Sequence, residues 1–561
     1  MSPADRPTMS EPRTTVGDLV ATFLGACGVA TAFGVISIHN MPILDAFHRG
    51  GRIRFVTARG EAGAASMADA AARTSGGLGV VVTSTGTACG NAAGALIEAL
   101  TAGTPLLHLT GQIDTPYLDR SLGFLHEAPA QLAMLKAVSK AAFRISRPED
   151  ALQVLREAAR AALTAPQGPV SVEIPIDVQR AFVSVPAHCR PETVQPLTVD
   201  AAVLDRLASR MRDARRPLIW LGGGARNAAT GARALADLGI GIVSSAAGRG
   251  IVSEDHPSSL AAFGAAPAVE PLYASSDLIL VVGSHLRSNE TRTYTVKLPS
   301  NLIRVDADAA ARSRGYRESE FILADAASVL DGLAARLAQR PPSLDPEFAS
   351  DIAKTRRAAD AGLRQQAGDY AAVIEALDRI LPRDALWVRD ITLSNSIWGN
   401  RAPRIRRPRQ AIHAMGGGIG MGLPMAIGAA LAAAGRKTVA LIGDGGFALS
   451  LGELATAAEN RTDLTILLMN DGGYGVIRNI QDQDYGARRC YTELQAPSFA
   501  LMAQSLGIRH RLVRDLAEFP AALSEAIGEA GSAIIEIDMP SAGAFGVRFA
   551  GPPKAVQSQT R

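Results

Sequence analysis

Short apolar runs alternate along this chain with longer Ala-rich stretches, and the alternation predicts strands followed by helices. The apolar runs are rich in Val, Ile and Leu and end in turn-forming residues, which is typical of strands buried on both faces. We expect strands at residues 52–58, 77–84, 104–111, 169–176, 217–224, 278–284, 301–308, 438–445, 464–471 and 532–539. This pattern indicates an α/β fold in which mainly parallel sheets are flanked by helices.

The predicted strands fall into three clusters, which indicate three domains. Pro-rich joins without helical periodicity separate the clusters near residues 183–200 and 338–348. We place the domains at residues 13–183, 198–338 and 355–540. We expect residues 1–12 and 541–561 to be flexible ends, the second of which could fold over a site as a lid.

Composition and charge exclude several classes of protein. Lys and Arg number 57 against 54 Asp and Glu, so the net charge is only +3, and a basic run occurs only near residues 404–409. This charge balance argues against binding to nucleic acids or membrane surfaces. No apolar run approaches the roughly 18 residues of a membrane span. The N-terminus lacks a signal-peptide core, and the four cysteines are scattered without a Cys-x-x-Cys pair, which favours a reduced, cytoplasmic location without a zinc site.

The sharpest chemical pattern lies at the ends of two strands in the third cluster. One strand ends in Gly443-Asp444-Gly445, and the next ends in Asn470-Asp471-Gly472-Gly473. Parallel strands joined by a helix end at the same edge of a sheet, so Asp444 and Asp471 can face one pocket. Two carboxylates in a glycine-lined site suit Mg²⁺ bridged to phosphates, although each segment alone could be an ordinary turn.

This pair of turns resembles the diphosphate and metal motif of thiamine diphosphate enzymes. The resemblance covers nearly the whole chain and is closest to the branch that includes acetolactate synthase and benzoylformate decarboxylase, with pyrimidine-binding, central and diphosphate-binding domains in that order. It implies that Asp444, Asp471 and the Gly473 carbonyl hold Mg²⁺ against the diphosphate. Family members often have Asn in place of Asp471, so this site carries one more negative charge.

The resemblance also implies further cofactor contacts. Glu61, in the segment FVTARGEAG, would form a hydrogen bond to the aminopyrimidine and favour the tautomer that removes a proton from the thiazolium. The same sequence pattern would also fit a Glu that only begins a helix. Ile419 would lie beneath the cofactor and bend it, and the Gly417 carbonyl would bind the aminopyrimidine. The remaining implied cofactor contacts are Thr392, Gly443, Gly445, Gly446, Tyr474 and Val476.

Three residues of the first domain resemble catalytic or pocket residues of the same branch. They are His39 on the loop after the first strand, Gln112 in a Gly-Gln turn, and His126 in a loop expected to move. Either histidine could instead be an ordinary loop residue. The predicted substrate pocket consists of Ile38, His39, Ile477 and Ile480, and its apolar wall favours a small or apolar 2-oxo acid.

The central domain invites a different interpretation, which we weigh against the first. A glycine-rich segment, residues 222–227, follows a strand as in a dinucleotide fingerprint, but Asn227 stands where the third glycine belongs. The domain also resembles the one that carries FAD in acetolactate synthase, where Arg287 and Arg292 could serve the site. Other members of the branch bind ADP or nothing there, so FAD and ADP stay unassigned.

Together these patterns predict an enzyme dependent on thiamine diphosphate and Mg²⁺ that decarboxylates a 2-oxo acid or joins the product to a second carbonyl. The resemblance implies active sites between the chains of a homodimer or homotetramer. An alternative is a 2-hydroxyacyl-CoA lyase of the same superfamily. A non-catalytic binding protein is a remote alternative, because such a protein would be expected to lose Glu61 or Asp444.

Overall fold

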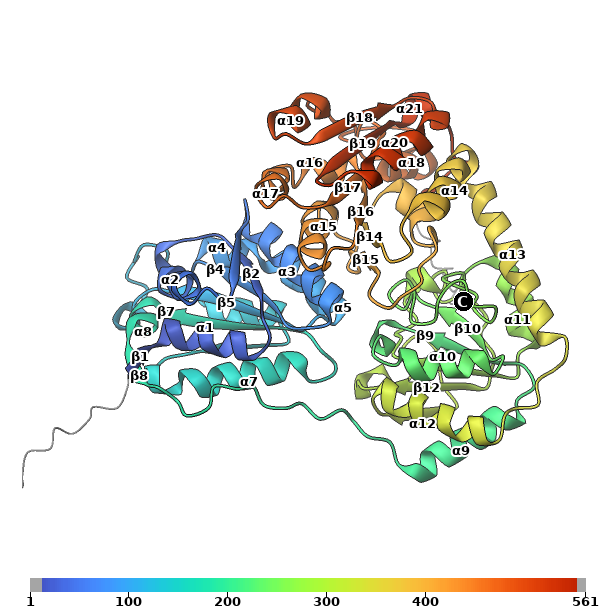
Figure 1. Cartoon of the computed structure of the whole chain (residues 1–561), viewed down its shortest axis with the longest axis horizontal. Coiled ribbons are helices and arrows are strands. Elements are labelled where there is room, and N and C mark those ends of the chain that lie inside the picture. Colours follow the sequence, from blue (N-terminus) through green and yellow to red (C-terminus); the bar gives the residue numbers. More distant parts are fainter. Residues whose placement is uncertain (1–12, 552–561) are drawn as a thin grey trace, which may run out of the picture. The chain divides into compact units, whose positions relative to one another are not determined.

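The computed structural model describes residues 13–551, which divide into two compact units. The first unit extends to residue 194, except that residues 73–76 group with the second unit, which continues from residue 195 (Figure 1). The flexible ends predicted at residues 1–12 and in the last ten positions of the tail lie outside the described residues. No helix in the described part is long and apolar enough to cross a membrane.

The first unit is built on a six-stranded parallel sheet with the strand order β3-β2-β4-β5-β7-β6. Its strands are β2 (Thr31–Gly34), β3 (Arg54–Thr57), β4 (Gly79–Thr83), β5 (Leu106–Gln112), β6 (Ala141–Arg144) and β7 (Pro169–Pro175). The longer helices are α1 (Val16–Ala26), α2 (Met41–Gly50), α3 (Glu61–Ser75), α5 (Ala93–Ala102), α6 (Gln131–Val138) and α7 (Ala151–Leu163). Apolar side chains of the central strands pack against α1, α2 and α7, so this sheet has the buried core that the sequence predicts.

The second unit contains two further parallel sheets. The central sheet has the order β10-β9-β11-β12-β13 and consists of β9 (Pro217–Leu221), β10 (Gly241–Ser244), β11 (Leu278–Val282), β12 (Leu302–Asp306) and β13 (Glu320–Leu323). The last sheet has the order β15-β14-β16-β17-β19-β18 and consists of β14 (Leu386–Arg389), β15 (Ala411–His413), β16 (Thr438–Gly443), β17 (Leu464–Asn470), β18 (Arg509–Val513) and β19 (Ala533–Asp538). The predicted α/β architecture with three parallel sheets is therefore confirmed.

Helices flank both of these sheets. Around the central sheet lie α9 (Ala201–Asp213), α10 (Ala229–Asp237) and α12 (Ala326–Gln339), which pack against one another. Around the last sheet lie α14 (Ala371–Ile380), α15 (Gly422–Leu431), α16 (Asp444–Ala448), α17 (Glu453–Glu459), α18 (Gly475–Asp484) and α20 (Phe519–Gly528). The green-to-yellow and orange-to-red parts of Figure 1 show these two layered groups.

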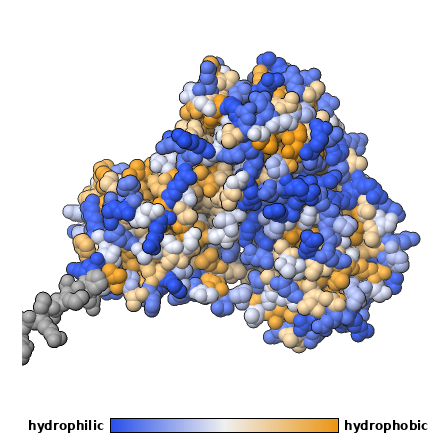
Figure 2. Space-filling view, viewed as in Figure 1, coloured by the Kyte–Doolittle hydropathy of each residue, from blue (hydrophilic) through white to orange (hydrophobic). Residues whose placement is uncertain are grey.

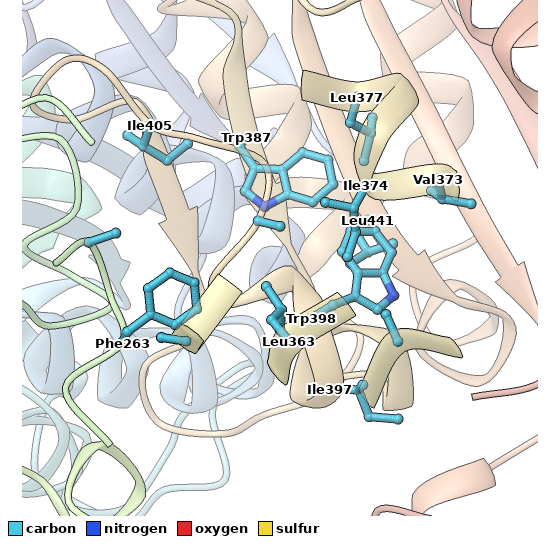
Figure 3. Close-up of a cluster of buried hydrophobic side chains, with 14 of the residues drawn as sticks. Phe263, Leu363, Val373, Ile374, Leu377, Trp387, Ile397, Trp398, Ile405 and Leu441 are labelled. Atoms are coloured by element: carbon cyan, nitrogen blue, oxygen red, sulfur yellow. The ribbon is translucent and has the colours of Figure 1, made fainter. Parts of the chain in front are cut away.

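A shared hydrophobic cluster joins the two sheets of the second unit. The long helix α13 (Phe348–Ala367) contributes Leu363 to this cluster (Figure 3). The last domain contributes Trp387 of β14 and Trp398, and the central domain contributes Phe263. Burial of large apolar side chains stabilises such a contact by about 25 cal/mol for each Å² removed from water. The central and last domains therefore form one compact unit, and the cavity described below lies within it.

Candidate active site

Two carboxylates meet where strands β16 and β17 end. The two strands pair in parallel with Gly443 opposite Met469, so Asp444 and Asp471 follow at the same edge of the sheet. The backbone N–H of Asp471 donates a hydrogen bond to Asp444 Oδ1 over 3.3 Å. The two acids thus lie side by side, as their positions after the strands predict.

The carboxylate of Asp444 is buried and only partly hydrogen-bonded. The residue is 2% exposed, and its Oδ2 has no hydrogen-bond partner in the described part of the chain. Burial and the neighbouring charge of Asp471 raise the pKa of Asp444 to about 6. A buried carboxylate oxygen without a partner is unfavourable unless a cation joins it, so the pair fits a divalent cation, and Mg²⁺ accepts such sparse carboxylate ligation.

Arg478 offsets part of the negative charge of this pair. Its Nη2 lies 3.0 Å from Asp471 Oδ2 and also donates to the Asp471 carbonyl oxygen over 2.6 Å. Burial raises the pKa of Asp471, while the Arg478 guanidinium acts in the opposite direction. The extra charge of an Asp at this position is therefore balanced within the chain. No group of three or more His, Cys, Asp or Glu side chains suited to a metal occurs within residues 13–551.

Glycine is required at the rim of this site because the backbone packs closely. Gly473 has φ +144°, and a Cβ there would lie 2.0 Å from the carbonyl oxygen of Thr492. At Gly445 a Cβ would lie 2.7 Å from the ring of Tyr474. Main-chain groups thus form the rim, which is the arrangement that lets a backbone approach phosphate oxygens.

A buried acid holds the loop that presents Ile419. Asp390 follows strand β14, and its carboxylate accepts hydrogen bonds from the N–H groups of Ile391 (2.7 Å) and Gly420 (3.0 Å). Burial raises the pKa of Asp390 to about 6. Ile419 itself is 40% exposed although it is apolar, so its side chain is free to support a ligand.

A cavity of about 940 Å³ opens over this edge of the sheet. Every cofactor or pocket residue predicted in the last domain lines it: Thr392, Gly417, Ile419, Gly443, Asp444, Gly445, Gly446, Asp471, Gly473, Tyr474, Val476, Ile477 and Ile480. The volume is in the range of ligand sites, which is about 300–1,000 Å³. The structure thus brings these residues together, while their individual roles stay predictions.

The opposite wall of the cavity comes from helix α13, the central domain and the C-terminal tail. Phe549 and Gly551 line it, and Asn479 of α18 donates to the Phe549 carbonyl oxygen over 2.9 Å. Phe545 stacks on Tyr370 with ring centroids 4.5 Å apart. The described part of the tail therefore packs against the cavity, while its role as a lid stays a prediction.

In the first unit, Glu61 is the first residue of α3, directly after strand β3 and a short turn. Its Oε2 accepts a hydrogen bond from Asn91 Nδ2 over 3.1 Å. The carboxylate is only half-buried, and Asn91 is its neutral partner, so it keeps acceptor capacity for a ligand. Glu61 belongs to the first unit and Asp444 to the second, so the two predicted halves of the cofactor site lie in different units.

His39 and His126 are neighbours in the first unit. Their ring centroids lie 5.2 Å apart in an edge-to-face arrangement. His39 is buried, and its Nδ1 has no hydrogen-bond partner in the described part of the chain. Burial and the nearby His126 lower the pKa of His39 below its ordinary value. The structure therefore brings together two histidines that lie far apart in the sequence.

Gln112 is also near this end of the sheet, but other side chains engage it. Its Oε1 accepts hydrogen bonds from the Thr85 hydroxyl and the Ile113 N–H, each over 2.9 Å. Its Nε2 lies 3.5 Å from Glu173, which also accepts a hydrogen bond from Gln131. The amide thus takes part in a buried polar network with Thr85, Gln131 and Glu173.

The glycines of the central domain are explained by packing. A Cβ at Gly222 would lie 2.0 Å from the carbonyl oxygen of Gly283, and the N–H of Gly224 donates to that same oxygen over 3.0 Å. Arg287 donates to the Met415 carbonyl oxygen over 3.1 Å, and Arg292 pairs with Glu270. These contacts account for the glycine-rich segment and the two arginines without a nucleotide, so FAD and ADP stay unassigned.

Comparison with protein families gives three matches in chain order. Residues 14–134 match the N-terminal TPP binding domain of thiamine pyrophosphate enzymes, residues 204–333 match the central domain, and residues 393–537 match the C-terminal TPP binding domain. The three matches correspond to the three parallel sheets.

Curated proteins resemble the chain over nearly its full length. It is 32% identical to a probable 2-ketoarginine decarboxylase, AruI, of Pseudomonas aeruginosa, and the alignment covers 95% of each chain. It is 26% identical to the large subunit of acetolactate synthase isozyme 1 of Escherichia coli, covering 94% of this chain and 95% of that one. It is 27% identical to a probable acetolactate synthase large subunit of Methanocaldococcus jannaschii, covering 90% and 88%.

Proposed function

Because the chain belongs to the thiamine pyrophosphate enzyme family, we propose that it uses thiamine diphosphate and Mg²⁺ to decarboxylate a 2-oxo acid. The observation that carries the Mg²⁺ part is the buried Asp444 carboxylate, whose Oδ2 lacks a partner beside Asp471 at the glycine rim of the cavity. Without a cation, only Arg478 would compensate the charges of the buried Asp444 and the half-buried Asp471.

Each residue of the second unit has a simple task in this proposal. Asp444, Asp471 and the Gly473 carbonyl would hold the cation, and Ile419 would support the ring system from below. Thiamine diphosphate, when bound, supplies the carbon that attacks the substrate carbonyl and stabilises the negative charge left when CO₂ departs. The apolar side chains of Ile477 and Ile480 would keep water away from that carbon.

In the first unit, the proposed tasks concern protons. Glu61 would hold a proton at the aminopyrimidine nitrogen, and His39 and His126 would exchange protons with the substrate. Histidine suits such transfers because its ordinary pKa lies near neutral pH. Gln112 would act by holding the loop around His39.

The relatives support two outcomes of the reaction. The probable 2-ketoarginine decarboxylase supports release of an aldehyde, whereas the acetolactate synthases support joining the two-carbon unit to a second carbonyl. We favour decarboxylation, because the relative with that name is 32% identical and the acetolactate synthases are 26–27% identical. Carboligation is the second candidate.

Assembly into homodimers or homotetramers, together with a cytoplasmic location, belongs to the same proposal. Five apolar side chains close in sequence to His39 or His126 are exposed: Ile36, Ile38, Met41, Leu122 and Leu125. We call them the histidine-side patch. Figure 2 shows hydrophobic residues exposed over much of the first unit, at the left of the view. Exposed apolar patches commonly mark interaction surfaces, which supports a contact with a second chain.

The test is to incubate the purified protein with thiamine diphosphate, Mg²⁺ and a panel of 2-oxo acids, and to count CO₂, aldehyde and acyloin separately. The panel includes pyruvate, longer aliphatic acids and an acid with a guanidinium group. We expect CO₂ release from at least one acid, dependent on both cofactors and absent in Asp444→Ala. CO₂ release that continues without Mg²⁺ or thiamine diphosphate, or no release from any acid by cofactor-loaded protein, would contradict the proposal.

A further inference from the structure

Asp114 lies beside His39, and nothing above gives it a task. Strand β5 ends at Gln112, and the turn that follows carries Asp114. This end of β5 is pressed against His39, because a Cβ at Gly111 would lie 2.2 Å from the His39 carbonyl oxygen. That oxygen also accepts a hydrogen bond from Gln179 Nε2 over 2.7 Å, and the same Nε2 donates to Ile174 of β7, so the backbone of His39 is held at this end of the sheet.

The carboxylate of Asp114 has no hydrogen-bond or ion-pair partner in the described part of the chain, unlike two other acids of the same segment. Asp119 pairs with Arg144 at 2.5 Å, and Glu127 accepts a hydrogen bond from the Phe124 N–H over 3.0 Å. Asp114 is only half-buried. The negative charge of Asp114 opposes the effects of burial and of His126 on the pKa of His39, which agrees with the short separation that the turn imposes.

Exposed apolar side chains lie near this acid, together with two further charged groups: Asp177 accepts a hydrogen bond from the adjacent Thr115 hydroxyl, and the charge of Arg180 acts on His39. Three residues of the histidine-side patch are close to His39 in the sequence, and the other two are close to His126. The rings of the two histidines are in contact. Leu125 is 73% exposed and Ile38 is 60% exposed. A ligand that reaches His39 along this face would therefore meet aliphatic side chains and the Asp114 carboxylate, and the charges of Asp114, Asp177 and Arg180 sum to −1. An aliphatic chain that ends in a cation is complementary to both features.

We infer that Asp114 determines substrate specificity by binding the cationic end of the substrate. The substrates would be 2-oxo acids that carry an ammonium or guanidinium group on an aliphatic side chain. The inference rests on the proposed function, because it names the substrate class of that same site. The aliphatic part of such a substrate agrees with the apolar wall predicted from the sequence. The cationic end adds a requirement that the wall alone does not impose.

The experiment measures two substrates of similar length on the cofactor-loaded parent, Asp114→Asn and Asp114→Ala. The cationic acid is 2-oxo-5-guanidinopentanoate, and the neutral acid is 2-oxooctanoate, whose side chain is uncharged. We expect the parent to prefer the cationic acid in kcat/KM. Asp114→Asn should reduce kcat/KM for the cationic acid by about 10- to 100-fold, since a hydrogen bond between charged groups is lost. The loss for 2-oxooctanoate should be clearly smaller, because it comes only from weaker protonation of His39 once the Asp114 charge is gone. The ratio of the two kcat/KM values should therefore fall.

Asp119→Asn is the matched control, since it removes the same charge from the same segment at a paired, exposed position. It should leave the ratio of the two kcat/KM values unchanged, and thermal unfolding should verify that each variant is folded. An equal loss for both substrates in Asp114→Asn, or a parent that decarboxylates neutral acids as well as the cationic one, would overturn the assignment of Asp114 alone. No CO₂ from any acid would overturn the proposed function and this inference with it.

Discussion

Glu61 and Asp444 are both acids of the candidate site, but their surroundings assign them different tasks. Glu61 is half-buried with Asn91 as a neutral partner, whereas Asp444 is buried beside a second carboxylate. We therefore expect Glu61→Gln to lose most turnover and keep cofactor affinity, because the amide preserves shape but cannot hold the proton. Asp444→Ala should lose cofactor binding. Calorimetric titration with thiamine diphosphate and Mg²⁺ separates the two, and equal loss of affinity in both variants would show that the roles are wrongly assigned.

The raised pKa of Asp444 also predicts how cation binding depends on pH. Below about pH 6 the group takes up a proton, and a cation must displace that proton to bind. The Mg²⁺ affinity should accordingly be constant above about pH 7 and fall as the pH drops through 6, by up to about tenfold for each pH unit. Titrations between pH 5 and 8 measure this slope. In Asp444→Asn the overall affinity should be weaker and the slope between pH 5 and 7 much smaller, whereas an unchanged slope would assign it to another group.

His39 and His126 are adjacent, so their substitutions test whether the pair moves protons. General acid or base help is typically worth about 10²- to 10⁴-fold in rate, and we expect a loss in this range for the histidine that acts. If His39 delivers the proton after CO₂ leaves, His39→Ala should slow aldehyde release more than CO₂ release. His126→Ala, on a loop expected to move, should alter KM as well as kcat.

The pH profile gives the sign of that effect. The pKa of His39 lies below its ordinary value, so the residue is mainly neutral at pH 7 and becomes protonated only as the pH falls further. At saturating cofactor, a step that needs protonated His39 should speed up from pH 8 to pH 6 and lose that dependence in His39→Ala. Turnover of both alanine variants within about twofold of the parent, far below the acid-base range, would make both residues ordinary loop histidines.

At the scale of strands and helices, the sequence predicts inner strands well and edge strands poorly. All ten predicted strands are present, and nine of them lie inside their sheets, where both faces are buried and the sequence is apolar throughout. Five of the missed strands, β6, β10, β13, β15 and β18, lie at sheet edges, and most of them are short or carry charged side chains. The expected ranges also omit the inner strands β2 and β14, each four residues long, and the separate antiparallel pair β1 (Arg13–Thr15) and β8 (Phe182–Ser184). An edge strand needs apolar side chains on fewer positions, so its pattern is weaker.

The candidate site shows the same division between local and tertiary information. The turns with Asp444 and Asp471 could be predicted, because each follows directly from a buried strand. Asp390 could not be singled out in the same way, since it acts through a hydrogen bond from Gly420, which only the folded chain brings near. Arg478 is close to Asp471 in sequence, but its contact depends on how α18 begins after the turn. The only local indication of Asp390 is its position directly after strand β14.

A buried ion pair connects the central domain to the loop before strand β15. Arg249 donates to both carboxylate oxygens of Glu254 at 2.7 and 2.8 Å and also to the carbonyl oxygen of Asn400 at 3.1 Å, while Glu254 accepts a hydrogen bond from the Ile405 N–H. We expect Arg249→Met to destabilise the second unit by about 3–5 kcal/mol, because it leaves a buried charge without its partner. Denaturant unfolding measures this loss.

The matched control for that substitution is the exposed Arg407→Met, which should change stability by no more than about 0.5 kcal/mol. Asn400 lines the cavity, so Arg249→Met should also weaken cofactor binding at temperatures where the protein is still folded. A loss of stability no larger than that of Arg407→Met would mean that the pair does not hold the loop.

At the scale of the whole molecule, the proposed site needs two surfaces from two different units. The acids for the cation lie in the second unit, and Glu61 and the histidines lie in the first, next to the histidine-side patch. In the proposed assembly, a second copy of the chain would cover that patch and complete the site. Symmetric pairing of two chains would then create two equivalent sites, each with Glu61 from one chain and Asp444 from the other.

This arrangement predicts recovery of activity from two inactive chains. In a mixed dimer of Glu61→Ala and Asp444→Ala chains, one site lacks both acids and the other has both intact. Random mixing makes about half of the dimers mixed, each with one of two sites restored, so roughly a quarter of the parent activity should return. The control mixes Asp444→Ala with the double variant Glu61→Ala/Asp444→Ala, in which no site can be complete. If each site were built within one chain, demonstrably mixed dimers would stay as inactive as this control, because every chain lacks one of the two acids.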